Sequence, residues 1–392
     1  ILSKFNLLCF SILFETPPIF TLASLGCGLS PSLNQLLFFR VIQGVGGALL
    51  LPVGRLSLLK IIPRTQFLAA MSLMSLAGLL GPLAGPTLGG WLVEVATWHW
   101  IFLINIPMGV LGILMTLKVM PNVKEPTVKT FDLIGFVLLV VAMIGWSLGI
   151  EHLASPEYSK WFSISLLVVG VVATLWYAYH SHTHQNALFR SRLFRNKIYA
   201  IGILGNFFAR FGGNALPFVL PLMLQVAFGF EPFIAGLMMI PLVLGSLFSK
   251  PIVRPIIQKM GYRRFLLVNT TLVGLCIASF AIMTVDTPTW FRALHFFLFG
   301  TLNSLQFVGM NTLTLKDLPQ QDASSGNSFL SMIMMLSMSI GVALAGTLIN
   351  IFTDYYGTAH VTTAFHVTLI CLGCINIITA LIFWQIPKNT PV

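Results

Sequence analysis

Charged side chains are scarce in this sequence. Only 8% of its 392 residues are Asp, Glu, Lys or Arg, whereas about a quarter of the residues in an ordinary soluble domain are charged. Hydrophobic residues make up 56% of the chain. Because no soluble core needs so much apolar side chain, the composition excludes a soluble globular protein and indicates that lipid surrounds most of the chain.

Cysteine is also rare, and its positions exclude a disulfide framework. All five cysteines lie inside apolar stretches, at Cys9, Cys27, Cys276, Cys371 and Cys374. The last two have the spacing of a redox or zinc pair, but the sequence places no second pair and no cluster of histidines or carboxylates near them. We interpret them as packing residues.

The motifs of soluble enzymes are missing as well. We find no phosphate-binding loop, no nucleophile elbow and no acid pair spaced for hydrolysis. His180, His182 and His184 alternate in the sequence, but no acid or cysteine accompanies them there. We therefore interpret them as a wet interfacial stretch instead of a metal site, and we expect no enzyme activity, no metal and no cofactor.

Long apolar runs are what the sequence does contain. A helix needs roughly 20 apolar residues to cross a bilayer, and runs of that length recur along the whole chain, separated by short loops. We predict an all-α polytopic membrane protein with about 12 spans. They lie near residues 7–28, 35–58, 66–92, 99–118, 133–150, 161–180, 198–227, 232–256, 265–285, 290–312, 326–352 and 363–385.

Alternate loops are basic, and by the positive-inside rule these loops face the cytoplasm. The alternation supports the number of spans, because one missed segment would put basic loops on both sides of the membrane. Lys4 and Lys388 then place both termini in the cytoplasm. The net charge of +11 is spread over these loops instead of forming one stripe, so we expect no nucleic-acid binding.

Two longer connections divide the spans into groups of four, two and six. We predict four parts: helices of an N-terminal bundle over residues 1–120, whose first stretch 1–18 is atypical, two inserted central spans with cytoplasmic linkers over 121–197, a C-terminal six-helix bundle over 198–387, and a cytoplasmic tail over 388–392.

The second span carries an arginine and an amide on one helix face, Arg40 and Gln43. Gly44 and Gly46 follow them and allow another helix to approach closely. An arginine at a helix centre costs roughly 2.5 to 3.5 kcal/mol, so such residues usually face a protein interior or a watery cavity. Arg40 and Gln43 are therefore candidates for substrate binding or coupling. The alternative is that Arg40 extends to the lipid headgroups.

Other spans contain further unusual residues. Asn105 lies within the fourth span, and Arg210 and Asn214 lie near the middle of the seventh, where an arginine reaches the headgroups less easily. We predict that Asn105 and Arg210 line a cavity, and all three residues are further candidates for substrate binding or coupling. The third span combines a stripe of small residues with prolines that bend the helix. Its members are Ala77, Gly81, Pro82, Gly85, Pro86, Gly89 and Gly90.

These motifs resemble those of the drug:proton antiporters of the major facilitator superfamily. The residues from Arg40 to Gly46 match the fourth-span motif of that superfamily, and those from Gly81 to Gly90 match its fifth-span antiporter motif, although Ser72 replaces an earlier glycine. The start of the fourth span, Trp98 to Gly109, and the two spans between the halves are similar to the fourteen-spanner branch typified by EmrB and QacA.

The resemblance implies a major facilitator fold in which the 12 predicted helices are family spans three to fourteen. The family begins with two further spans, so we expect this chain to be truncated at its N-terminus, and we expect the acid that couples transport to protons in the family's first span. The second-half loop of the family is represented by Lys259, Gly261, Arg263 and Arg264. The resemblance implies that this cytoplasmic gate loop braces helix ends.

The resemblance further implies a monomeric secondary transporter of the bacterial inner membrane, in which two bundles rock about a midplane cavity. Inward proton flow would drive small molecules such as drugs outward, so the proton gradient would be its energy source. Lipophilic cations are the expected substrates. The charges of Arg40 and Arg210 leave an anionic metabolite or a metal chelate as an alternative. A membrane scaffold that does not transport is the alternative of a different class.

Overall fold

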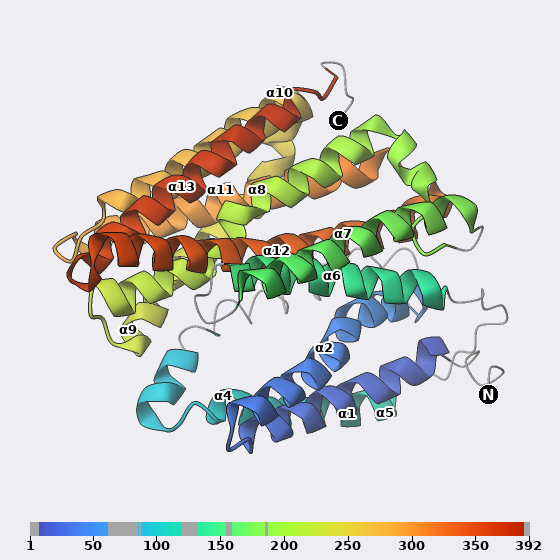
Figure 1. Cartoon of the computed structure of the whole chain (residues 1–392), viewed down its shortest axis with the longest axis horizontal. Coiled ribbons are helices and arrows are strands. Elements are labelled where there is room, and N and C mark those ends of the chain that lie inside the picture. The colour runs from blue at the N-terminus through green and yellow to red at the C-terminus, as the bar shows by residue number, and fades with distance from the viewer. Residues whose placement is uncertain are drawn as a thin grey trace. The chain divides into compact units, whose positions relative to one another are not determined.

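The computed structural model describes residues 8–61, 85, 88–119, 132–153, 159–184 and 187–387, and its regular secondary structure there is entirely helical (Figure 1). Helices satisfy every internal backbone N–H and C=O within one segment, which lipid cannot do. The prediction of an all-α polytopic membrane protein is confirmed. The chain divides into two compact units, residues 1–129 with 231–237, and residues 130–230 with 238–392.

Eight helical stretches in the described part of the chain are long and apolar enough to cross a membrane. One of them, residues 232–282, contains two of the predicted spans, so these stretches together account for nine of the 12. The predicted spans near 7–28 and 35–58 form helices α1 and α2. The span predicted near 66–92 lies mostly outside the described residues, although residues 88–95 are helical.

The first unit is organised around α1 (Leu8–Gly28), which packs against α2 (Leu33–Ile61) and α5 (Asn105–Val119). Short helices α4 (Trp100–Leu103) and α9 (Pro232–Leu237) also belong to this unit. Gly46 lets α2 lie close to the backbone of α1, because a Cβ atom at this position would lie 2.8 Å from the Phe20 nitrogen. Close packing was thus correctly predicted at Gly46, whereas Gly44 meets no described atom within 4 Å.

In the second unit, α10, α11, α13 and α8 pack together, α6 pairs with α7, and α12 contacts α6, α8 and α13 (Figure 1). Residue 261 interrupts α10 and separates two predicted spans. The helices are α6 (Leu133–Leu153), α7 (Lys160–Thr183), α8 (Lys197–Leu222), α10 (Ile240–Ser279), α11 (Thr289–Lys316), α12 (Gln320–Tyr356) and α13 (Val361–Phe383).

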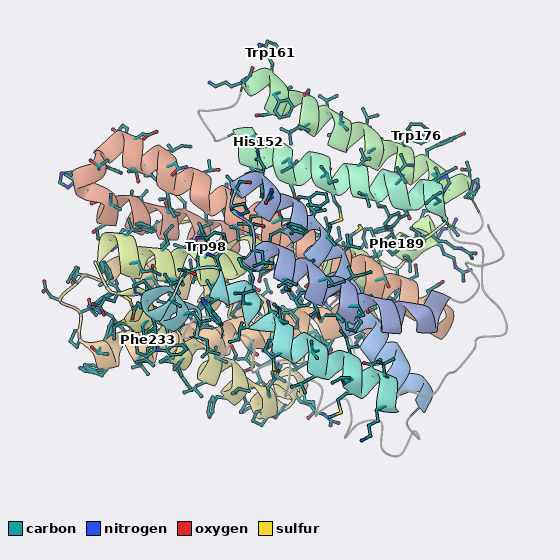
Figure 2. The ribbon with its side chains drawn as sticks, turned by 90° about the horizontal axis from the view of Figure 1, so that it is seen from below. Trp98, His152, Trp161, Trp176, Phe189 and Phe233 are labelled. Atoms are coloured by element: carbon teal, nitrogen blue, oxygen red, sulfur yellow. The ribbon has the colours of Figure 1, made fainter. Side chains whose placement is uncertain are left out.

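Apolar side chains cover the outer face of the α6–α7 pair. Trp161 and Trp176 both project away from the ribbon in Figure 2, and 81% of the Trp161 surface is exposed. Exposed tryptophans of this kind are unfavourable in water but suit contact with lipid or its interface. The outer face therefore has the character expected of a membrane protein.

Glycines bring pairs of helices into backbone contact. A Cβ at Gly274 of α10 would lie 2.7 Å from the Gly373 carbonyl oxygen, and one at Gly373 of α13 would lie 2.6 Å from the Gly274 oxygen. Gly145 of α6 approaches Gly170 of α7 in the same way. In lipid the hydrophobic effect does not drive helices together. Small residues let the helices approach closely enough to gain dispersion contacts instead.

We predict that Gly274→Ala destabilises the protein by about 1 to 3 kcal/mol, because the added methyl group overlaps a backbone oxygen. Gly346→Ala on α12 is the matched control, since no described atom lies within 4 Å of its Cβ position; it should be neutral or stabilising by up to about 1 kcal/mol. Thermal unfolding of both variants in the same detergent checks this. Equal unfolding temperatures would contradict the close helix contact.

Candidate functional site

Arg40 lies on α2 at the end of a chain of hydrogen bonds in the first unit. Its Nη1 donates to Gln43 Oε1 at 2.9 Å, and Gln43 Nε2 donates to Ser24 Oγ on α1 at 2.6 Å. The guanidinium also lies over the Phe102 ring, 5.2 Å from its centroid. Gln43 is buried, whereas Arg40 is exposed. A buried amide thus positions an accessible cation. Ser24 was not predicted, because it lies on another helix.

Asn105 begins α5 and lines a cavity of about 370 Å³ within the first unit. Thr16, Phe20 and Met108 contribute to the same cavity, but Arg40 and Gln43 are not among its lining residues. The Thr21 hydroxyl donates to the Pro17 carbonyl oxygen of its own helix. The structure therefore places Asn105 at a cavity, as predicted. The hydrogen-bonded residues Arg40 and Gln43 are not part of that cavity.

The predicted antiporter-motif helix is described only in part. Gly81, Pro82 and Pro86 lie outside the described residues. A Cβ atom at Gly90 would lie 2.5 Å from the Pro232 carbonyl oxygen, whereas Gly85 and Gly89 meet no described atom within 4 Å. Close packing is therefore visible at Gly90 alone among these three described glycines.

Arg210 is the most deeply buried cation of the predicted site residues, with 5% of its surface exposed. Its Nε and Nη2 donate to Asn206 Oδ1 at 3.1 and 2.9 Å, and Nη2 also donates to Asn311 Oδ1 at 3.3 Å. The Phe307 ring lies against the guanidinium, 4.5 Å from its Cζ. Within the described residues no carboxylate pairs with Arg210, so neutral groups alone hold its charge.

Further amides extend this polar layer across four helices of the second unit. Asn376 Nδ2 on α13 donates to the Ala209 carbonyl oxygen at 3.0 Å, and Gln306 Nε2 on α11 donates to Thr270 Oγ1 on α10 at 3.0 Å. Asn214 is half-buried, but it has no hydrogen bond in the described part of this layer. The structure thus joins Arg210 to amides that were not predicted and leaves Asn214 apart.

One of these partners could have been found in the sequence. Asn206 precedes Arg210 by four residues, which places both side chains on one helix face. Asn311 is 101 residues away from Arg210, so only the packing of α11 against α8 reveals it.

The predicted gate loop contains the break in α10. Gly261 has φ 72° and ψ 157°, a backbone conformation that suits glycine because it has no Cβ. Arg263 lies over the Trp384 ring, 5.0 Å from its centroid, whereas Lys259 and Arg264 are exposed. One of the predicted loop cations therefore contacts the residue that follows α13. Its role as a brace stays a prediction.

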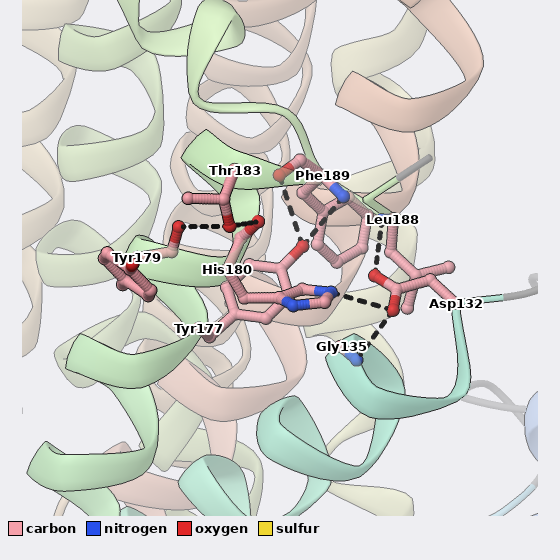
Figure 3. A network of polar contacts seen from close by, with 8 residues as sticks. All are labelled: Asp132, Gly135, Tyr177, Tyr179, His180, Thr183, Leu188 and Phe189. Carbon is pink, nitrogen blue, oxygen red and sulfur yellow. Dashed lines mark hydrogen bonds and ion pairs between the residues drawn. The ribbon is translucent and has the colours of Figure 1, made fainter. Parts of the chain in front are cut away.

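Asp132 and His180 form a buried pair that was not predicted (Figure 3). His180 Nε2 lies 2.9 Å from Asp132 Oδ1, and 7% and 5% of the two side chains are exposed. The backbone N–H groups of Gly135 and Leu188 donate to the same carboxylate at 2.9 and 3.2 Å. These contacts fasten the start of α6 to the end of α7 and to the following linker.

The interpretation of the three histidines as a wet stretch is therefore wrong for His180, because it is buried against an acid that lies 48 residues earlier. His182 and His184 are exposed. No group of three His, Cys, Asp or Glu side chains able to hold a metal occurs among the described residues. We interpret the Asp132–His180 pair as a structural contact that joins α6 to α7.

The electrostatics of Asp132 follow from its partners. Burial disfavours the charged carboxylate, but the hydrogen bonds from Gly135, His180 and Leu188 more than compensate, so the pKa of Asp132 lies below its usual range. The ionised form is therefore the one that the fold stabilises.

Residues 16–342 match the Major Facilitator Superfamily. The multidrug resistance protein MdtD of Enterobacter sp. (strain 638) is 47% identical over 97% of this chain and 81% of its own length. MdtD of Escherichia coli O6:H1 is 48% identical with the same coverage. Among solved structures, a D-xylose–proton symporter has a TM-score of 0.66 at 15% identity, covering 98% of this chain and 83% of its own.

A transporter of the POT family, solved with 5-aminolevulinic acid, has a TM-score of 0.68 at 16% identity, covering 96% of this chain and 81% of its own. At these identities the two structures support the fold alone. The relatives named MdtD carry the closer likeness, over nearly the whole chain.

We predict that Asn206→Leu destabilises the protein by about 1.5 to 3 kcal/mol, because it removes the main acceptor of a buried charged group. Asn350→Leu is a suitable control, since Asn350 is exposed on α12 and its replacement should change stability by less than about 0.5 kcal/mol. Thermal unfolding in detergent measures both. A neutral Asn206→Leu would mean that Asn206 does not support the arginine.

The lowered pKa of Asp132 gives its stabilising effect a definite pH dependence. The contribution is present above the pKa of the unfolded chain, about 3.9, and is lost as the pH falls through the folded pKa. Asp132→Asn should therefore lower the unfolding temperature at pH 7, and this difference from the wild type should shrink as the pH approaches 3. A difference that grows on acidification would contradict the assignment.

Proposed function

Because this chain belongs to the Major Facilitator Superfamily and is a multi-pass membrane transporter, we propose that it exports small molecules such as drugs in exchange for protons. The observation that carries this proposal is 47 to 49% identity to proteins named for multidrug resistance, over 97% of the chain. In the proposed mechanism two helical bundles alternate between access to each side of the membrane.

Arg210 supplies a physical role for the second unit in this mechanism. A fixed positive charge in a membrane interior stabilises a nearby anion and disfavours a nearby cation. Since Asn206 and Asn311 are neutral, they orient the guanidinium without cancelling its charge. Arg210 would then either bind an anionic group of the substrate or favour the ionised form of an acid that exchanges protons.

The uncancelled positive charge of Arg210 also favours a second candidate, export of an anionic metabolite or a metal chelate. Among the described residues, Arg40 also has a neutral hydrogen-bond partner, Gln43. A cavity that recognises cations would be expected to place acids near its centre. The charge of the substrate is therefore the point that separates the two candidates.

We also propose the orientation and the assembly. The basic loops place both termini in the cytoplasm, and the relatives point to the bacterial inner membrane. We propose that one copy forms the transport unit, because a major facilitator fold contains both bundles in one chain.

Transport in everted membrane vesicles that contain the full protein tests the proposal. Ethidium, a lipophilic cation, should accumulate when the vesicle interior is acidified, and a protonophore should abolish the accumulation. We predict that Arg210→Gln lowers the rate about tenfold, because the ionised form of the acid that exchanges protons then loses about 1.4 kcal/mol of stabilisation. Arg254→Gln, an exposed arginine of α10, is the control and should leave the rate unchanged.

A gradient-independent signal would contradict proton exchange. Absence of ethidium transport, together with gradient-driven movement of organic acids or their metal chelates, would favour the anionic candidate. Absence of all transport would support a membrane scaffold instead.

A further inference from the structure

A large apolar cavity lies in the second unit, away from Arg210. It has a volume of about 780 Å³ and is lined by α6, α7, the linker before α8 and residues 329–336 of α12. Aromatic side chains form much of its wall: Trp146, Tyr177, Phe189, Phe194 and Phe329. The proposed transport role of Arg210 does not use this cavity, because Arg210 is not one of its lining residues.

A smaller polar cavity of about 290 Å³ adjoins the apolar one. The two share Ser181, His182, Ser191 and Arg192 in their linings. Arg195, which follows Arg192 by three residues, also lines the apolar cavity. Among the described residues that line either cavity there is no acid. The apolar cavity therefore adjoins a polar cavity that is lined by cationic and hydroxyl-bearing side chains.

The walls are fixed by specific contacts. Leu188 of the linker donates its N–H to Asp132, and its carbonyl oxygen accepts a 2.7 Å hydrogen bond from Ser325 Oγ of α12. The Phe329 ring packs edge-on against Phe189 at 5.1 Å and Phe194 at 5.3 Å. The Asp132–His180 pair of Figure 3 therefore holds the linker that forms one wall. Such a preformed cavity binds its ligand without a large ordering cost.

The shape matches one class of molecule. Residues 174 to 182 of α7 run along the apolar cavity, a distance of about 12 Å at the rise of an α-helix. At one end, Trp146 Nε1 donates to Thr174 Oγ1 at 3.2 Å. At the other end lie Arg192 and His182. A ligand that fills both cavities needs an apolar chain and an anionic head.

We propose that this composite cavity binds an anionic phospholipid. The phosphate lies against Arg192, with the hydroxyl of Ser191, and an acyl chain occupies the aromatic cavity. The basic linker belongs to a loop that the charge pattern assigns to the cytoplasm, where anionic headgroups attract basic residues. Lipid is the favoured source of this chemistry because the neighbouring Trp176 is exposed on the outer face of α7 (Figure 2).

Native mass spectrometry of the delipidated full protein in detergent tests this site. Phosphatidylglycerol should bind more tightly than phosphatidylcholine with the same acyl chains. Arg192→Gln/Arg195→Gln should weaken phosphatidylglycerol binding about tenfold. Lys250→Gln/Arg254→Gln removes the same charge from α10 and should leave binding unchanged. Ala178→Phe fills the apolar cavity and should weaken binding while keeping every charge.

Each remaining outcome overturns the assignment. Equal binding of the two lipids, or unchanged binding in both cavity variants, would show that the cavity does not select an anionic lipid. Displacement of the lipid by equimolar inorganic phosphate would show a phosphate site without use of the acyl chain. Displacement by an exported compound would place the cavity on the transport route. Circular dichroism and size-exclusion profiles of each variant confirm that it is folded.

Discussion

The backbone N–H and C=O groups in the membrane-spanning part of this chain must find their partners within the protein, because lipid offers none. In the spans that the structure describes, the backbone meets this constraint by forming helices. Several polar side chains also bond across helices, as Gln43 does with Ser24 and Asn376 with the Ala209 carbonyl. Helix packing in the two units is therefore held by glycine contacts and by amide hydrogen bonds, and these same amides surround the candidate site residues.

The two candidate arginines have partners of a particular kind. Within the described residues, Arg40 and Arg210 are held by neutral amide oxygens and aromatic faces instead of carboxylates. A carboxylate would compensate the cost of burial more completely, but it would also cancel the charge. Neutral partners leave the positive charge for a ligand or for a titrating group. The neutral partners of Arg210 on α8 and α11 thus connect the packing of these helices with the proposed transport function.

Much of the fold could be predicted from the sequence, because apolar length and alternating loop charge are local properties. The same locality identified Arg40 with Gln43 and would have identified Asn206 with Arg210. Partners from distant helices could not be found this way. Asp132 lies 48 residues from His180, and no periodicity connects them, so the buried pair and the cavity beside it became evident only in the structure.

The central claim is that Arg210 acts on a ligand through its charge and does not serve packing alone. Equilibrium binding of an exported compound that carries an anionic group to purified wild-type, Arg210→Lys and Arg210→Gln protein tests it most directly. The account predicts affinity about tenfold lower for Arg210→Gln, partial recovery in Arg210→Lys, and unfolding temperatures that do not follow the affinities. Unchanged affinity in a folded Arg210→Gln protein would contradict it.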